Sequence, residues 1–266
     1  MSHFTVLVIG AKTEEEIREA LYPFWELDLS RDELVEDPRA VFEPKFPVEE
    51  LESEFQKCLV ENADYLEEKK LHYEDAQEWI ENWHGYYLNK ESTHYGYYHN
   101  PNAKWDWHQV GGRWAGYFRL REGEHGIKGE PSLLMSDEDK EKTLTEPLIA
   151  DIVRKGDVDF EGMLLEKEAH AKESWKKYQE QLETGTNPYF EFGVKEGDTE
   201  ESYVKRHTSF ATFAVVKDGK WYEKGQMGWW GIVADEKGQD TWEEEFAKLL
   251  EDLPDDTLLA LVDCHI

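Results

Sequence analysis

The sequence has little cysteine, little positive charge and no long hydrophobic run. Its 266 residues include two cysteines, Cys58 and Cys264, with no C-x-x-C pair and no spacing typical of a zinc site. Two cysteines so far apart favour a reducing compartment, so we expect a cytoplasmic protein. The apolar stretch at residues 4–9 is too short for a signal peptide or a membrane span, and no membrane association is predicted.

Acidic residues outnumber basic ones, with 60 Asp and Glu against 30 Lys and Arg, and the formal net charge is −30. This charge disfavours direct contact with DNA, RNA or an anionic membrane. It leaves open an acidic decoy, in which the expected helices at 48–83 and 159–183 imitate nucleic acid and bind a host nucleic-acid enzyme as a protein partner. The simpler interpretation is a well-solvated acidic surface.

Both ends of the chain predict strands, and together they favour an α+β fold. The order strand-helix at the start and strand-hairpin-helix-strand at the end is typical of a ferredoxin-like split β-α-β sheet, in which the terminal strands are neighbours. The expected segments are a buried strand at 3–9, a capped helix at 13–21, a strand at 209–217, a hairpin turn at 218–219, a strand at 228–233, a helix from Thr241 and a last strand at 258–265.

The middle of the chain predicts a large helical and aromatic-rich insertion. Helical spacing of apolar residues covers 48–83 and 159–183, short helices are expected in 136–155, and the acidic segment 24–47 and the Gly-rich segment 121–131 are expected to be loops. Because no linker is evident, we expect one compact domain spanning 1–266. Its sheet core would be at about 1–23 and 205–266, and its insertion at about 48–184.

Residues 84–119 differ in composition from the rest of the chain. They contain 10 aromatic residues, 4 of the 10 histidines and four basic residues, but only the acids Glu91 and Asp106. Within this segment the sequence from Asn100 to Trp114, which we call the aromatic block, combines three Trp with a Gly pair and an Arg. Flat rings beside a guanidinium suit a ligand with a ring and an anionic group.

The first hypothesis is therefore a binding protein for a nucleotide-like small molecule. In this hypothesis three Trp rings stack on the ligand, cationic side chains neutralise phosphate, polar side chains read its edges and two further Trp form a second wall. The stacking rings are Trp105, Trp107 and Trp114, and the cations are Arg113 and Lys104. The polar side chains are Asn102 and His108, and the second wall is Trp229 and Trp230. The alternative is a structural tight turn whose Trp side chains fill the core. The Gly pair matches neither phosphate-loop pattern, and no motif names a cofactor.

The second hypothesis is a hydrolase that acts on a nucleotide-like substrate in the same pocket. His108 would be the general acid and base, and Asp106 would be its orienting partner or a metal ligand, because residues two apart on a strand share a face. Three more histidines, His84, His94 and His99, lie nearby. No pair of them has the spacing of a helical zinc motif, so no metal site is predicted.

A smaller cluster is expected where the chain ends meet. If the terminal strands pair, His3 and His265 approach each other, and Asp263 shares a face with His265. The simpler interpretation is a packed edge of the sheet, and the alternative is a metal or proton-transfer site made of these three residues. Cys264 and His265 are adjacent on a strand, so they point to opposite faces and do not form a nucleophilic pair.

Three segments resemble a family of phage and bacterial proteins. They are the opening Met1–Ile9, the aromatic block with its Asn-Pro-Asn-Ala-Lys-Trp-Asp-Trp and Gly-Gly-Arg-Trp sequences, and the Lys155–Phe160 segment. The likeness spans nearly the whole chain, and the aromatic block is its most specific part. The family brings no established activity. The resemblance implies a phage-linked setting in the host cytoplasm, where evasion of host defence or nucleotide metabolism are the roles to expect.

Overall fold

The computed structural model describes residues 2–185 and 189–266, and the side chains of these residues except Tyr189, Phe190 and Trp229. The chain divides into two compact units, Met1–Tyr22 with Lys104–Ile266 and, inserted between them, Pro23–Ala103. The expected single domain over 1–266 stays a prediction, and the inserted unit has other bounds than the insertion expected at 48–184. The aromatic strand at 94–99 belongs to this unit because it pairs with the strand at 41–47.

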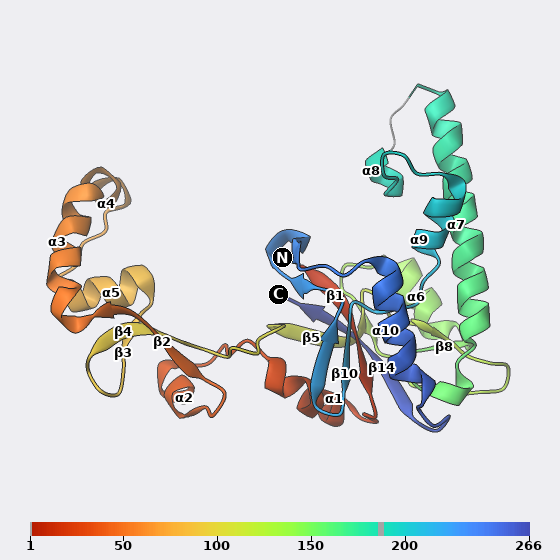
Figure 1. Ribbon diagram of the computed structural model, residues 1–266, viewed down its shortest axis with the longest axis horizontal. Helices are drawn as coiled ribbons and strands as arrows, with labels where there is room; N and C mark the ends of the chain where they lie inside the picture. The colour runs from red at the N-terminus through yellow and green to blue at the C-terminus, as the bar shows by residue number, and fades with distance from the viewer. Residues whose placement is uncertain (1, 186–188) are drawn as a thin grey trace. The chain divides into compact units, whose positions relative to one another are not determined.

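The first unit is built on a mixed sheet with the strand order β11-β10-β1-β14-β5-β7, and β9 also pairs with β14 (Figure 1). The bounds are β1 His3–Ile9, β5 Trp107–Gly112, β7 Glu130–Pro131, β9 Ile152–Arg154, β10 Ala214–Lys217, β11 Lys220–Glu223 and β14 Leu258–His265. The terminal strands β1 and β14 pair antiparallel along their whole length, from His3 opposite His265 to Ile9 opposite Leu259. The α+β class and the pairing of the chain ends are thus confirmed, and the parallel pairing of β1 with β10 makes the sheet mixed.

Three helices of this unit follow the patterns read from the sequence. Helix α1, Glu14–Leu21, starts with the expected capping box, in which Thr13 and Glu16 bond each other's backbone N–H groups. Helix α7, Phe160–Glu183, is one continuous helix capped by Asp159. Helix α10, Gln239–Glu251, starts after Gly238, so the cap expected at Thr241 is wrong by three residues.

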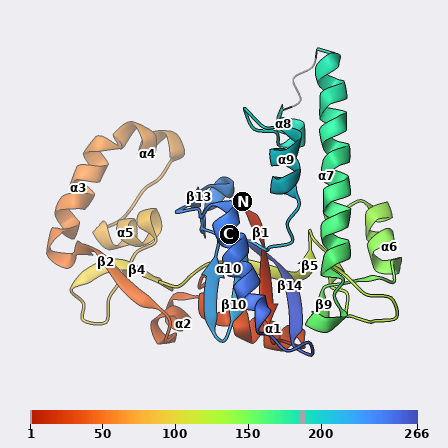
Figure 2. The same cartoon turned by 45° about the vertical axis from the view of Figure 1, so that its right-hand side comes forward.

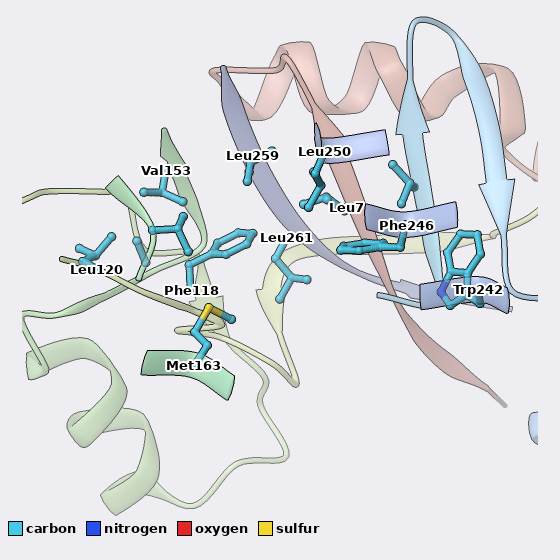
Figure 3. Packing of buried hydrophobic residues seen from close by; sticks show 13 residues of the cluster. Leu7, Phe118, Leu120, Val153, Met163, Trp242, Phe246, Leu250, Leu259 and Leu261 are labelled. Atoms are coloured by element: carbon cyan, nitrogen blue, oxygen red, sulfur yellow. The ribbon is translucent and has the colours of Figure 1, made fainter. Parts of the chain in front are cut away.

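The main core lies where α10 and the start of α7 cover one face of the sheet (Figure 3). Side chains from β1, β10 and β14 meet Trp242, Phe246 and Leu250 of α10 and Met163 of α7 there. Figure 2 shows α10 lying along these strands. Burial of apolar surface on both sides of this contact stabilises the unit.

Two local predictions failed in this unit. The strand expected at 228–233 is a turn, η4 Trp229–Gly231, between the short strands β12 Gln226–Met227 and β13 Val233–Ala234. Positive φ angles of 64° at Trp230 and 71° at Gly231 turn the chain there. The short helices expected in 136–155 are one helix, α6 Asp137–Thr145, followed by strands β8 Ile149–Ala150 and β9.

The second unit, Pro23–Ala103, has a three-stranded sheet in the order β2-β4-β3 and its own core. Its elements are α2 Arg31–Glu36, β2 Val41–Pro47, α3 Leu51–Glu61, α4 Ala63–Lys69, α5 Ala76–His84, β3 Tyr87–Leu88 and β4 His94–His99. The loop expected at 24–47 is wrong, because that segment contains α2 and β2, whereas the helical pattern expected at 48–83 is confirmed.

The elements not yet given are short. In the first unit they are β6 Phe118–Arg119, α8 Tyr189–Phe192 and α9 Glu200–His207. The short 3-10 turns are η1 Tyr22–Phe24, η2 Val48–Glu50 and η3 Lys155–Asp157.

No helix among residues 2–185 and 189–266 is both long and apolar enough to cross a membrane.

Candidate functional site

The Gly111–Gly112 pair ends β5 in a turn that only glycine allows. Both residues have positive φ, 77° and 57°, a region that costs side-chain-bearing residues energy. A Cβ at Gly112 would lie 2.5 Å from the Asp263 Oδ2, and a Cβ at Gly111 would lie 3.0 Å from the Asp151 Oδ2. The pair therefore lets the backbone approach two buried carboxylates of its own chain.

These two carboxylates accept the N–H groups of the turn. The Asp263 side chain, 1% exposed, accepts the Arg113 N–H at 2.9 Å. Asp151 is fully buried and accepts the N–H groups of Gly116, Tyr117 and Gly129 at 2.7, 3.1 and 2.8 Å. Burial raises the pKa of Asp151, although the three N–H donors act against that shift. The turn is thus held by hydrogen bonds to side-chain carboxylates, which matches the structural alternative for this block.

Trp105 and His108 lie together on the face of the sheet next to α1. The Trp105 side chain is buried and its indole N–H donates to the Leu21 carbonyl at 3.1 Å. Its ring meets the His108 ring edge-on with centroids 4.7 Å apart. Burial, with a smaller effect of the Arg18 charge, lowers the pKa of His108. Trp105 therefore fills the core and is not free to stack on a ligand.

Asp106 contacts the last histidine of the chain, His265. Its Oδ1 lies 2.6 Å from the Nδ1 of His265, and its backbone N–H donates to the His265 carbonyl at 2.9 Å. Asp106 precedes the first residue of β5, so the alternation of faces along that strand does not apply to it. The structure therefore places Asp106 at His265, and its expected role beside His108 stays a prediction.

The chain ends bring a second histidine to the same place. His3 Nδ1 lies 2.8 Å from Asp263 Oδ1, and the His3 and His265 rings meet edge-on with centroids 4.8 Å apart. In the register of the sheet, His3 on β1 is opposite His265 on β14, which is opposite Trp107 on β5. The expected approach of the two terminal histidines is confirmed. We call His3, His265, Asp106, Asp263 and Trp107 the paired-histidine site.

The arrangement has the parts needed for proton transfer. The Nδ1 of each ring faces a carboxylate oxygen, and a ring that carries its proton on Nδ1 donates it to that oxygen and leaves the Nε2 lone pair to accept another proton. The two imidazole side chains are about 15% exposed, and the Trp107 ring, 6.0 Å from that of His3, is 48% exposed. An exposed aromatic ring thus lies beside two mostly buried imidazoles.

The other predicted ligand-binding residues have different surroundings within their own units. Lys104 forms an ion pair with Glu223 at 2.7 Å, Trp114 packs against the main core, Asn102 is exposed in the second unit, and Arg113 and Trp230 are exposed in the first. The side chain of Trp229 lies outside the described residues. Of the predicted residues, Trp107 lies beside His3. The backbone N–H of Arg113 bonds Asp263, which is one of the carboxylates at the paired histidines.

The remaining histidines of the aromatic region lie in a different unit from His108. His84, His94 and His99 belong to the second unit, where His84 stacks on Tyr86. Among the residues with described positions, no group of three or more His, Cys, Asp or Glu side chains is placed to hold a metal ion.

Comparison with family models, with curated proteins and with solved structures finds no match to this chain.

Proposed function

We propose that the protein binds a nucleotide-like small molecule at the paired-histidine site and hydrolyses a phosphate ester of it. The observation that carries this proposal is the pair of imidazoles, each oriented by its own carboxylate, with ring centroids 4.8 Å apart. Two oriented imidazoles supply a base and an acid for the same reaction. The exposed Trp107 ring offers a face for the base of the ligand.

The reaction requires the two histidines to differ in protonation. The neutral imidazole takes a proton from water through its Nε2, and the water oxygen forms the new bond to phosphorus. The protonated imidazole gives its Nε2 proton to the leaving oxygen as the phosphorus–oxygen bond breaks. Asp263 and Asp106 hold the two rings in place, and Arg113, whose backbone N–H bonds Asp263, is the exposed cation that would neutralise the phosphate.

The test is a turnover screen of nucleotides, cyclic nucleotides and dinucleotides followed by phosphorus NMR. His3→Gln and His265→Gln should each lower kcat by about 10²- to 10⁴-fold, whereas His125→Gln, which changes an exposed histidine of the same unit, should leave the rate unchanged. Trp107→Ala should raise KM more than it lowers kcat, and Trp107→Phe should restore most of the affinity. Equal turnover by the histidine variants and the wild type would refute the assignment.

Binding without turnover is the second candidate, and the open Trp107 face supports it. In the phage setting that the resemblance implies, such a protein would sequester a host signal nucleotide. It predicts a ligand that raises the melting temperature and is recovered unchanged, with His3→Gln and Trp107→Ala both weakening it. If no nucleotide shifts the melting temperature and none is turned over, both candidates fail.

A further inference from the structure

A second site is found at a cavity away from the paired histidines. The cavity has a volume of about 1150 Å³ and is lined from β6, α6, α7, α8 and α9. Its apolar wall consists of Met135, Leu148, Ile149, Met163 and Phe192. None of the predicted ligand-binding residues lines it. We call it the lysine cavity after Lys167, the lysine of α7 that lines it. Lys167 differs from the other lysines of that helix in its burial and in its partners.

Lys167 lies on the stripe of α7 that otherwise packs inward. Its neighbours four residues before and after, Met163 and Ala171, are 4% and 2% exposed. The lysine thus stands where helical spacing would place an apolar side chain. Its Nζ lies 5.6 Å from the centre of the Tyr117 ring. Burial lowers the pKa of Lys167, since a charged amine is poorly solvated there.

The other lysines of α7 have carboxylate partners along the helix. Lys172, Lys176 and Lys177 pair with Glu168, Glu180 and Glu173, all four residues away. No carboxylate in the described part of the chain forms an ion pair with Lys167.

The acid next to Lys167 in sequence is already engaged. Glu166 is held by Arg119 at 3.3 Å, and Arg119 also binds Asp159 at 3.0 Å. Lys167 therefore carries an amine at the cavity that forms no ion pair with a carboxylate of the described residues, and the charge of Glu166 acts on it only without direct contact.

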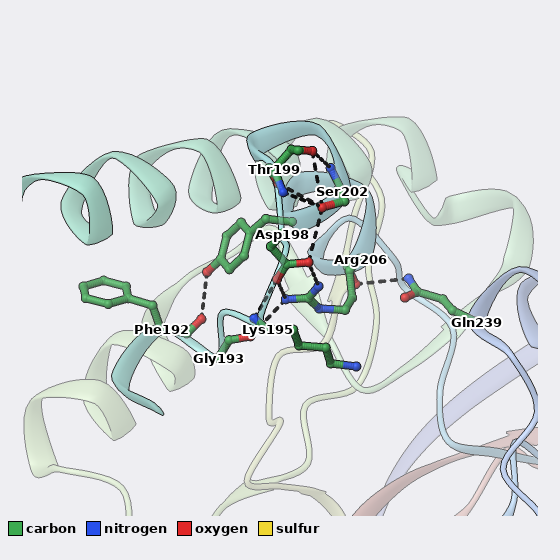
Figure 4. Close-up of polar contacts among 9 residues, drawn as sticks. Phe192, Gly193, Lys195, Asp198, Thr199, Ser202, Arg206 and Gln239 are labelled. Atoms are coloured by element: carbon green, nitrogen blue, oxygen red, sulfur yellow. Dashed lines mark hydrogen bonds and ion pairs between the residues drawn. The ribbon is translucent and has the colours of Figure 1, made fainter. Parts of the chain in front are cut away.

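The opposite wall of the cavity is held by its own hydrogen bonds (Figure 4). The Tyr203 hydroxyl donates to the Phe192 carbonyl at 3.0 Å, which ties α9 to α8. Arg206 makes two hydrogen bonds to Asp198, at 2.7 and 2.6 Å, and these fix the loop before α9. A wall with this support needs little reordering when a ligand enters.

We propose that the lysine cavity binds the carboxylate of an amphipathic small molecule, with the carboxylate at Lys167 and the apolar chain against Met163, Ile149 and Phe192. A monoanion fits better than a phosphate dianion for two reasons. The carboxylates of Glu146, Glu166 and Glu191 also line the cavity, and the nearby Arg119 is already neutralised. The apolar wall gives a hydrocarbon chain the burial that a compact oxyanion cannot use.

The test uses decanoate as the probe, below its micelle concentration, with calorimetry on the full chain. Lys167→Met removes the amine and restores the apolar stripe, so it should fold and should weaken decanoate binding by about tenfold or more. Lys177→Met, which changes an exposed lysine of the same helix, should bind decanoate as the wild type does. Amine labelling read by mass spectrometry should show decanoate protecting Lys167 and not Lys177.

Three results would overturn the proposal: decanol binding as tightly as decanoate, inorganic phosphate displacing decanoate from Lys167, or equal decanoate affinity in Lys167→Met and the wild type. Should Lys167→Met fail to fold, the labelling experiment on the wild type decides alone, and an unprotected Lys167 refutes the site. His3→Gln and His265→Gln should leave decanoate binding unchanged, so this site and the paired-histidine site can fail separately.

Discussion

Replacing Gly112 by alanine tests whether the Gly pair exists to admit the carboxylate of Asp263. The new Cβ would lie 2.5 Å from the Cβ and the Oδ2 of Asp263. Real contacts of this kind are essentially never so short, so Asp263 or the turn must move. The same carboxylate accepts hydrogen bonds from the Arg113 N–H and from the His3 ring, and movement weakens both.

Gly112→Ala should lower the free energy of unfolding for two reasons. Holding alanine at a φ of 57° costs about 1–2 kcal/mol, because a Cβ in the left-handed region crowds the following carbonyl. Displacing a buried carboxylate from its donors costs about 1–3 kcal/mol more. The sum of about 2–5 kcal/mol is a large share of the roughly 5–15 kcal/mol that stabilises a typical domain.

Gly123→Ala is the matched control. Gly123 also has a positive φ, 86°, but an added Cβ meets no atom within 4 Å. It should therefore show only the backbone cost of about 1–2 kcal/mol. Amide exchange of β14 peptides across a urea series is the suitable assay, since the second unit can unfold separately and would blur a global signal. If Gly112→Ala costs no more than Gly123→Ala, the contact with Asp263 does not explain the glycine.

Three further predictions concern stability. Asp151→Ala should cost about 3 kcal/mol or more in urea unfolding, because it leaves three buried N–H groups without an acceptor; a neutral effect would contradict this. Thr13→Ala should cost about 1 kcal/mol and Thr13→Ser much less, since only the serine keeps the cap; equal losses would count against the cap. The Arg206 guanidinium lowers the pKa of Asp198 in the folded protein. The ionised Asp198 therefore stabilises the fold fully above the pKa of about 3.9 that an aspartate has in the unfolded chain, and this stabilisation is lost as the pH falls below that value. Amide exchange of α9 should therefore quicken on acidification in the wild type more than in Asp198→Asn, and equal responses would refute the coupling.

The parts of the fold that the sequence predicts are those specified by neighbouring residues. A continuous apolar run at 258–262 marks β14, Leu258–His265, which is buried along nearly its whole length, and Thr13 and Glu16 mark the start of α1. The pairing of β1 with β14 followed from the order of elements at the two chain ends. The hairpin at Asp218–Gly219 followed from its residue types, which tolerate the positive φ angles found there.

The parts that escaped prediction depend on contacts far along the chain or on unusual backbone angles. Strand β2 lies in a segment whose acids and prolines favour a loop, and it forms because β4 pairs with it some fifty residues later. The turn at Trp229–Gly231 resembles a strand in composition. Its geometry depends on Trp230 at a φ of 64°, which a bulky residue rarely adopts.

The candidate site shows the same division. The meeting of His3 and His265 could be predicted because it needs only the pairing of two strands. The partner of Asp106 could not, because that carboxylate lies just outside its strand and bonds a histidine 159 residues away. Lys167 gave no local signal, since a lysine is ordinary in an amphipathic helix and only the packing shows that it faces inward.

The aromatic block supports the proposed site more than it contacts a ligand. Its Gly pair brings the Arg113 N–H to one oxygen of Asp263, and the other oxygen holds His3. A change at Gly112 would therefore be transmitted to the imidazole through one carboxylate, without touching the ligand. This explains how a rare combination of Gly, Trp and Arg can lie beside a site whose histidines come from the first and last strands. Groups that orient a reactive imidazole are as necessary as the imidazole itself.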